Sequence, residues 1–286
     1  MQAKLQLGGT RPVHESPALG SGEMGHNLFP VSIFLAIAVP LFSQNYKVIT
    51  VVDGGTISGT VKWLGAVPRS LEAPITKDQQ ICDPEGKKTT DLERLIVGPE
   101  GGVANTIVYL KDIPSGKAFD FPRQLRHLDQ EHCRYVPHIL LVAQSEILTM
   151  QSSDATLHTI HMDGAATYNL PFPFPNQPTS RTMPTPGLVN LRCNGGHVWM
   201  NAEMMVVSHP YYVVTDETGR FELTSVPPGK YQIVAWHEGW GLVGKEQAFD
   251  VLTEQSGTPG IQSAENLGEV CHCRRKPDGE YKLRSL

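Results

Sequence analysis

The stretch YYVVTDETGRFELTSVPPGKYQIVAWHEG, residues 211–239, indicates the fold of this chain most clearly. It contains apolar segments separated by a first turn at 216–219 and a second turn at 227–229. Between the turns, Phe221 and Leu223 alternate with polar residues, which is the pattern of a strand with one buried face. Gly and Pro gather in the turns, as they do between adjacent strands. The stretch therefore predicts three β-strands joined by two turns.

Similar patterns recur along the rest of the chain. β-Branched residues and Gly-rich turns predict strands within 45–66 and at 105–113, and two apolar runs lie within 133–154. Short strands are also predicted at 188–193 and around 202–209. No stretch has a convincing helical period. A content of 27 Gly, 22 Pro and only 19% charged residues favours a turn-rich protein, so the sequence predicts an all-β fold.

One segment does not follow this pattern. Residues 168–187, YNLPFPFPNQPTSRTMPTPG, contain six prolines. Proline lacks a backbone N–H and interrupts both helices and central strands, so we expect a long structured loop here.

An uncharged segment near the beginning of the chain indicates export. Residues 28–42, LFPVSIFLAIAVPLF, lie in a region without Asp, Glu, Lys or Arg. The apolar run is shorter than the roughly 20 residues of a membrane-spanning helix and contains two prolines. It fits the apolar part of a signal peptide, with cleavage after Ser43, better than a buried strand or a retained anchor. We therefore expect a periplasmic or secreted protein with no stable membrane span after cleavage.

Composition and motifs also argue against two classes of function. The formal net charge is −5, and the short run CRRK near the end is the one dense basic cluster, so nucleic-acid binding is not expected. The sequence has no HExxH or GxSxG motif and no other convincing catalytic arrangement. We therefore expect that the protein is not an enzyme.

The five cysteines leave one without a partner if the others pair. Exported proteins tend to oxidise thiols in pairs or use them as metal ligands. Cys82 and Cys133 are candidates for a disulfide, and Cys193 is the candidate for the unpaired thiol, although a Cys133–Cys193 pair is an alternative. The triplet CHC at 271–273 could bind a soft metal or belong to a disordered tail.

The stretch RCNGGHVWM, residues 192–200, carries the metal hypothesis. It places Cys193, His197 and Met200 in the spacing C-x3-H-x2-M. Two imidazoles and a thiolate, with a weak thioether ligand, form the usual electron-transfer site of copper. Gly195 and Gly196 give the backbone freedom to return His197 toward Cys193.

A copper site of this kind requires a second histidine from elsewhere in the chain. His158 and His161, in LHTIHMD, are the candidates because they follow an apolar run at a predicted strand end. Three unrelated loop residues, or a zinc site on the His and Cys side chains alone, are the alternatives.

Residues 125–207 resemble plastocyanin-like cupredoxins of exported bacterial proteins. The resemblance rests on CRYVPHILLV, LHTIH and LRCNGGHVWMNAEMMVVSHPYYVVTD. It implies a Greek-key β-sandwich with one copper ion held by His158, Cys193, His197 and Met200. Two positions depart from that family: Thr159 stands where Asn is common, and the Cys-to-His gap is three residues instead of two. Thr159 and His161 are then expected beside the ligands, with His161 the alternative ligand.

The segments GGTISGTVKWLG, NTIVYL and 211–236 resemble the carboxypeptidase regulatory-like domain, a small transthyretin-like β-sandwich. Because its opening and closing strands lie on either side of the cupredoxin-like region, we expect the cupredoxin domain to be inserted in it. The expected parts are a leader and signal peptide at 1–44, the first half of the small sandwich at 45–117, the cupredoxin domain at 118–207, the second half at 208–256 and a polar tail at 257–286.

These expectations combine into one functional hypothesis. The chain is predicted to be an exported mononuclear type 1 copper protein that carries single electrons between redox proteins whose identity the sequence does not give. We expect His197 near the surface as the exit route for the electron, with Trp199 and the prolines around 171–178 as a docking rim. A non-redox β-sandwich module that binds carbohydrate or a cell-surface partner, and a copper chaperone, are the alternatives.

Overall fold

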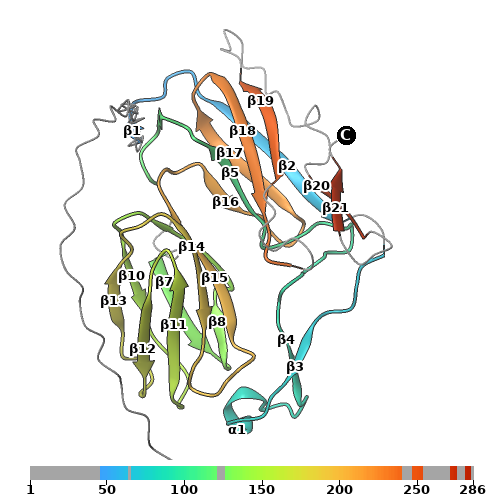
Figure 1. The fold of residues 1–286 in the computed structure, drawn as a ribbon, viewed down its shortest axis with the longest axis vertical. Helices are drawn as coiled ribbons and strands as arrows, with labels where there is room; N and C mark the ends of the chain where they lie inside the picture. The colour runs from blue at the N-terminus through green and yellow to red at the C-terminus, as the bar shows by residue number, and fades with distance from the viewer. Residues whose placement is uncertain are drawn as a thin grey trace, which may run out of the picture. The chain divides into compact units, whose positions relative to one another are not determined.

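The computed structural model describes residues 46–63, 66–120 and 126–239, together with the backbone of strands at 247–253, 271–275 and 281–284. The leader and signal peptide predicted at 1–44 lie outside the described residues. Within the described parts, the named elements are β-strands apart from one helix of four residues, which confirms the predicted all-β fold class (Figure 1). No described helix has the length and apolarity that a membrane span requires.

Residues 127–207 form a β-sandwich of two sheets (Figure 1). One sheet has the strand order β13-β10-β7-β8 and the other has the order β12-β11-β14-β15-β9. The strands are β7 (His127–Glu131), β8 (Arg134–Val136), β9 (Ile139–Ala143), β10 (Ile147–Met150), β11 (His158–Gly164), β12 (Tyr168–Phe172), β13 (Thr179–Thr182), β14 (Gly187–Arg192) and β15 (Asn201–Val207). Leu128 and Leu148 of the first sheet pack with Leu140 and Ile160 of the second in one buried core.

Two of these strands correct the expectation of a long loop at 168–187. β12 and β13 both lie in the proline-rich segment, and each is the edge strand of its sheet. Pro171 lies in β12 opposite Thr159 of β11. An edge strand tolerates proline because one side of its backbone has no neighbouring strand to receive an N–H bond.

A second pair of sheets is formed by segments that precede and follow the first sandwich in the sequence. The sheet orders are β16-β5-β18-β19 and β17-β2-β20-β21. The strands are β2 (Gly55–Trp63), β5 (Ile107–Lys111), β16 (Tyr212–Val214), β17 (Arg220–Val226), β18 (Gly229–Trp236), β19 (Gln247–Thr253), β20 (Cys271–Arg275) and β21 (Tyr281–Arg284). Ile57 and Leu110 share a buried core with Phe221 and Ile233. The exact domain boundaries stay predictions.

The stretch 211–239 contains β16, β17 and β18, as its alternation predicts. Asp216 organises the first turn, because its carboxylate accepts hydrogen bonds from the backbone N–H groups of Thr218 and Arg220. β17 pairs with β2, whereas β16 and β18 both pair with β5. The turn at Asp216 therefore carries the chain from one sheet to the other.

A short segment between β2 and β5 packs on the first sandwich. It comprises β3 (Glu72–Pro74), the helix α1 (Gln79–Cys82) and β4 (Thr89–Asp91), and we call residues 72–91 the cap segment. Ile75 and Cys82 of the cap segment belong to the core of the first sandwich. A disulfide joins Cys82 to Cys133, 51 residues later. The remaining strands, β1 (Lys47–Val48) and β6 (Ser115–Gly116), pair in parallel.

Candidate metal centre

Three ligand-type atoms converge at one end of the sheet that contains β11 and β14. His158 is the first residue of β11, and Cys193 follows the last residue of the neighbouring antiparallel strand β14. The loop between β14 and β15 then returns His197 to the same place. The two Nδ1 atoms of the histidines are 3.1 Å apart, and Cys193 Sγ lies 3.9 Å from His158 Nδ1 and 3.8 Å from His197 Nδ1.

The triangle formed by these atoms has the size of a metal site. A triangle with sides of 3.1, 3.8 and 3.9 Å has a circumradius of about 2.1 Å. One point in its plane is therefore equidistant from both nitrogens and the sulfur, at about the 2.0–2.3 Å that metal–imidazole and metal–thiolate bonds require. The Nδ1 atoms point toward the thiol, so the donor set of two imidazoles and one thiol fits a copper ion.

The site is closed to water. Both imidazoles are 0% exposed, and Cys193 is 6% exposed. Met200 is also buried and belongs to the same core cluster as Cys193. Its N–H donates to the carbonyl of His197, so a tight turn carries the chain from the loop histidine to the methionine.

Hydrogen bonds stabilise the thiolate form of Cys193. The backbone N–H groups of Thr159 and Gly195 point at Sγ from 3.4 and 3.3 Å. Burial raises the pKa of the thiol, but the bonds from His158, His197 and these two N–H groups outweigh burial and lower the pKa of Cys193 to about 5. The residue is therefore a thiolate at neutral pH, which is the form that binds metals.

Thr159 also braces the ligand loop. Its hydroxyl accepts the N–H of Asn194 at 2.7 Å, so the residue joins β11 to the loop directly after Cys193. This contact is a physical reason for a hydrogen-bonding side chain at this position. His161, the other residue expected beside the ligands, lies on the opposite face of β11 because it is an odd number of positions from His158. The structure does not bring His161 to the site.

The carboxylate that holds the strand histidine was not predicted from any sequence pattern. Asp154 Oδ2 lies 2.9 Å from His158 Nε2 and also accepts the N–H of Cys133, while Oδ1 accepts the N–H of His132. Burial raises the pKa of Asp154, but the bonds from His158 and the two N–H groups outweigh it and lower the pKa. Burial lowers the pKa of His158, and Asp154 and Cys193 more than compensate, so it is raised.

A second unexpected carboxylate holds the loop histidine. Asp78 of the cap segment places Oδ2 3.0 Å from His197 Nε2, and the same oxygen accepts the hydroxyl of Thr156 at 2.7 Å. Both imidazoles therefore turn Nδ1 toward Cys193 and Nε2 toward a carboxylate. Such partners fix the tautomer and orientation of a metal-binding histidine.

The cap segment also corrects the expected surface of the site. His197 was expected near the surface and Trp199 on a docking rim, but they are 0% and 3% exposed. Asp78 and the disulfide sulfurs of Cys82 and Cys133 lie close to His197, which was expected near the surface. The exposed apolar residue of the loop is Val198, at 80%.

Gly196 supplies a conformation that the loop requires. Its φ is +98°, and an added Cβ would lie 3.2 Å from the Lys77 side chain, whose ammonium donates to the carbonyl of Gly195. We expect Gly196→Ala to lower the free energy of unfolding by about 1 kcal/mol and to increase the reactivity of Cys193 with a thiol reagent. Gly86→Ala is the matched control, because Gly86 has a φ of +71° in open space. Equal reactivity of Cys193 in the Gly196→Ala and Gly86→Ala variants would contradict the conclusion that the ligand loop requires glycine at position 196.

A separate cluster of buried ionisable groups lies away from these ligands. His138 Nε2 pairs with Glu238 Oε1, and the other oxygen of Glu238 has no hydrogen-bond partner among the described residues. Burial and the Glu238 carboxylate raise the pKa of Glu203 to about 7, against the opposing effect of Arg94 and His138. His237 Nδ1 accepts the N–H of Gly239 and so closes a turn of the chain. His237 Nε2 lies 3.2 Å from the carbonyl oxygen of Ala104.

The raised pKa of Glu203 predicts a dependence of stability on pH. The folded pKa of about 7 exceeds the 4.5 that is usual for a glutamate, so between these two values the folded state holds a proton that the unfolded state has lost. The contribution of Glu203 to the free energy of unfolding should then fall by about 2 kcal/mol as the pH rises from about 4.5 to 7, less than the full shift because Glu203 is partly exposed. Cys193, His209 and His237 have lowered pKa values and change stability in the opposite direction over this range, so the effect is measured as a difference between variants. In denaturant unfolding, the stability of the native chain relative to Glu203→Gln should fall across this range, whereas its stability relative to the exposed control Glu222→Gln should stay constant. A constant difference between the native chain and Glu203→Gln would refute the prediction.

Comparison with known families gives one partial match. The second beta sandwich domain of the BOS complex subunit NOMO1-like family matches residues 207–262, which include β16, β17, β18 and β19. No curated protein matches the sequence.

Comparison with solved structures gives partial matches to copper proteins. The Cu-containing nitrite reductase from Thermus scotoductus SA-01 is 14% identical, and the match covers 28% of this chain and 22% of that protein with a TM-score of 0.27. The purple cupredoxin from Nitrosopumilus maritimus is 15% identical over 28% of this chain and 98% of its own, with a TM-score of 0.25. Amicyanin from Paracoccus versutus is 16% identical over 35% of this chain and 97% of its own, with a TM-score of 0.26.

Proposed function

We propose that this chain is a mononuclear copper protein that carries single electrons between redox partners in the periplasm or outside the cell. The observation that supports the proposal best is the convergence of Cys193 Sγ and the Nδ1 atoms of His158 and His197 on one point. His158, Cys193 and His197 would hold the ion, with Met200 as a weak fourth ligand. Copper, when bound, supplies a couple between two oxidation states that differ by one electron.

The contribution of the protein is to keep the ligands in one arrangement. Asp154 and Asp78 fix the two imidazole rings, and Thr159 fixes the loop that follows Cys193. The thiol is already deprotonated at neutral pH, and burial excludes water from all three ligands. Ligands that do not move between oxidation states keep the reorganisation that accompanies electron transfer small.

A non-redox binding role is the second candidate function, and it concerns the part of the chain that follows the first sandwich. The partial match to a β-sandwich domain at 207–262 favours a module that binds a partner without redox chemistry. Such a module could act alongside the proposed copper site or, if the Cys-His-His cluster is only structural, define the whole function. Copper delivery is less favoured, because a chaperone must release its ion and all three ligands are buried.

Electrochemistry of the copper-loaded full chain separates these functions. An electron carrier should give a reversible one-electron wave and should keep its copper in the presence of a competing chelator. A chaperone should lose copper to the chelator at a comparable rate in both oxidation states. Absence of both copper binding and a redox wave would leave the non-redox module as the function.

A further inference from the structure

We propose that Asp78 is a positioning residue for the loop ligand His197, and that the disulfide-linked cap segment delivers it to the site. This inference rests on the proposed copper site but not on electron transfer itself. Asp78 is 119 positions from His197 in the sequence, and it belongs to a segment that precedes every strand of the first sandwich. The ligand set would therefore depend on a part of the chain outside the sandwich that contains the ligands.

The contacts of Asp78 tie the loop to the sandwich. One oxygen, Oδ2, is shared by His197 Nε2 and the hydroxyl of Thr156, which lies two positions before His158. Asp78 thus connects the loop ligand His197 to the residues that directly precede the strand ligand His158. Because Asp78 accepts at Nε2, the Nδ1 lone pair of His197 stays directed at Cys193.

The backbone of Asp78 is itself unusual. It adopts a left-handed conformation, with φ of 48° and ψ of 41°, directly before α1. Its carbonyl accepts the N–H groups of Ile81 and Cys82. Its side chain caps no helix N–H and is directed to His197 and Thr156 instead. Strained conformations of this kind persist where the surrounding structure determines them, and they often occur at functional sites.

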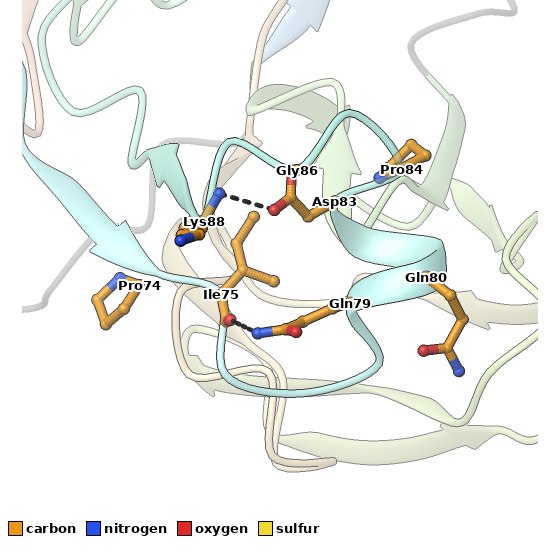
Figure 2. Close-up of a pocket in the computed structure, with 8 residues that line it drawn as sticks. All are labelled: Pro74, Ile75, Gln79, Gln80, Asp83, Pro84, Gly86 and Lys88. Atoms are coloured by element: carbon orange, nitrogen blue, oxygen red, sulfur yellow. Dashed lines mark hydrogen bonds between the residues drawn. The ribbon is translucent and has the colours of Figure 1, made fainter.

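Independent contacts keep the cap segment in place. The Cys82–Cys133 disulfide attaches α1 to the sandwich, and the Lys77 ammonium donates to the carbonyl of Gly195 in the ligand loop. Figure 2 shows that the segment is also braced internally, since Gln79 donates to the carbonyl of Ile75 and the backbone N–H of Lys88 donates to Asp83. These contacts would place the carboxylate of Asp78 before any metal binds.

The two histidines differ in how much they depend on such help. His158 lies in β11, and the ladder with β12 fixes its backbone. His197 lies in a loop that contains two glycines, so its backbone is intrinsically freer. His197 should therefore depend on its carboxylate partner Asp78 more than His158 depends on Asp154.

The first test uses the metal-free full chain and needs no copper. In nitrogen-15 NMR spectra, the Nε2–H proton of His197 should exchange slowly with water because Asp78 accepts it. Asp78→Ala should accelerate this exchange at least tenfold, the factor that corresponds to loss of one hydrogen bond to a charged group. Asp83→Ala is the matched control, because Asp83 accepts the N–H groups of Lys87 and Lys88 within the cap segment, whereas the carboxylate at His197 Nε2 is that of Asp78. Equal exchange in both variants would overturn the proposal.

The second test adds copper. Asp78→Ala should weaken Cu(II) binding about 10–100-fold and shift the visible spectrum, as the loss of an outer partner of a metal ligand does. Asp78→Asn keeps an acceptor and should restore slow exchange, which guards against a variant that merely fails to fold. If the native chain binds no copper but the exchange results hold, the function proposal fails and the positioning of His197 stands. If copper binds and Asp78→Ala changes neither property, Asp78 has no positioning role.

Discussion

Replacing Cys193 by serine is expected to abolish the intense visible absorption of the Cu(II)-loaded protein. That absorption requires a thiolate bound to copper, and Cys193 is the free cysteine among the described residues. Copper affinity should fall by more than about 100-fold, because loss of an outer partner alone costs 10–100-fold. Absorption spectra and competition with a chelator measure both effects.

The control for this substitution comes from the end of the chain. The double variant Cys271→Ser/Cys273→Ser removes the two remaining cysteines of the sequence and should keep both the visible band and the affinity. Loss of the band in this double variant and its persistence in Cys193→Ser would assign copper to the tail instead of the sandwich.

Removing the disulfide with Cys82→Ala/Cys133→Ala is expected to lower the free energy of unfolding by about 4 kcal/mol. The bond closes a loop of 51 residues, and the cost follows from the larger entropy of an unfolded chain without that constraint. Denaturant unfolding of the metal-free protein measures it, and a loss below about 1 kcal/mol would be inconsistent with a clamped cap segment.

The disulfide variant should also affect the ligand loop. With the cap segment released, Cys193 should react faster with a thiol reagent, because the segment lies against His197 beside it. The matched control is the Lys87→Met variant, which removes an exposed ion pair with Glu85 within the cap segment and keeps the disulfide, so Cys193 should stay as protected as in the native chain. Equal protection of Cys193 in the disulfide variant and the native chain would show that the cap segment stays closed without the bond.

The strands and much of the ligand loop could be predicted from local sequence. Alternation around Phe221 and Leu223 is a short-range pattern, and it corresponds to β17. The spacing of Cys193 and His197 is also local, because one short loop between adjacent strands holds both residues. His158 could be proposed because a residue at the start of a neighbouring antiparallel strand lies near that loop.

The cap segment could not be predicted in this way. Asp78 lies in a polar, turn-rich region without periodicity, and its contact with His197 depends on how distant parts of the chain fold together. The burial of His197 and Trp199 follows from that contact and was missed for the same reason. The strands β12 and β13 were missed because proline argues against strands in general but is compatible with edge strands.

X-ray absorption at the copper edge of the loaded full chain tests the central claim most directly. The account predicts one sulfur at about 2.2 Å and two imidazole nitrogens at about 2.0 Å from a single copper ion. It also predicts that the sulfur contribution disappears in Cys193→Ser. A copper ion surrounded by oxygen and nitrogen atoms alone in the native chain would contradict the account.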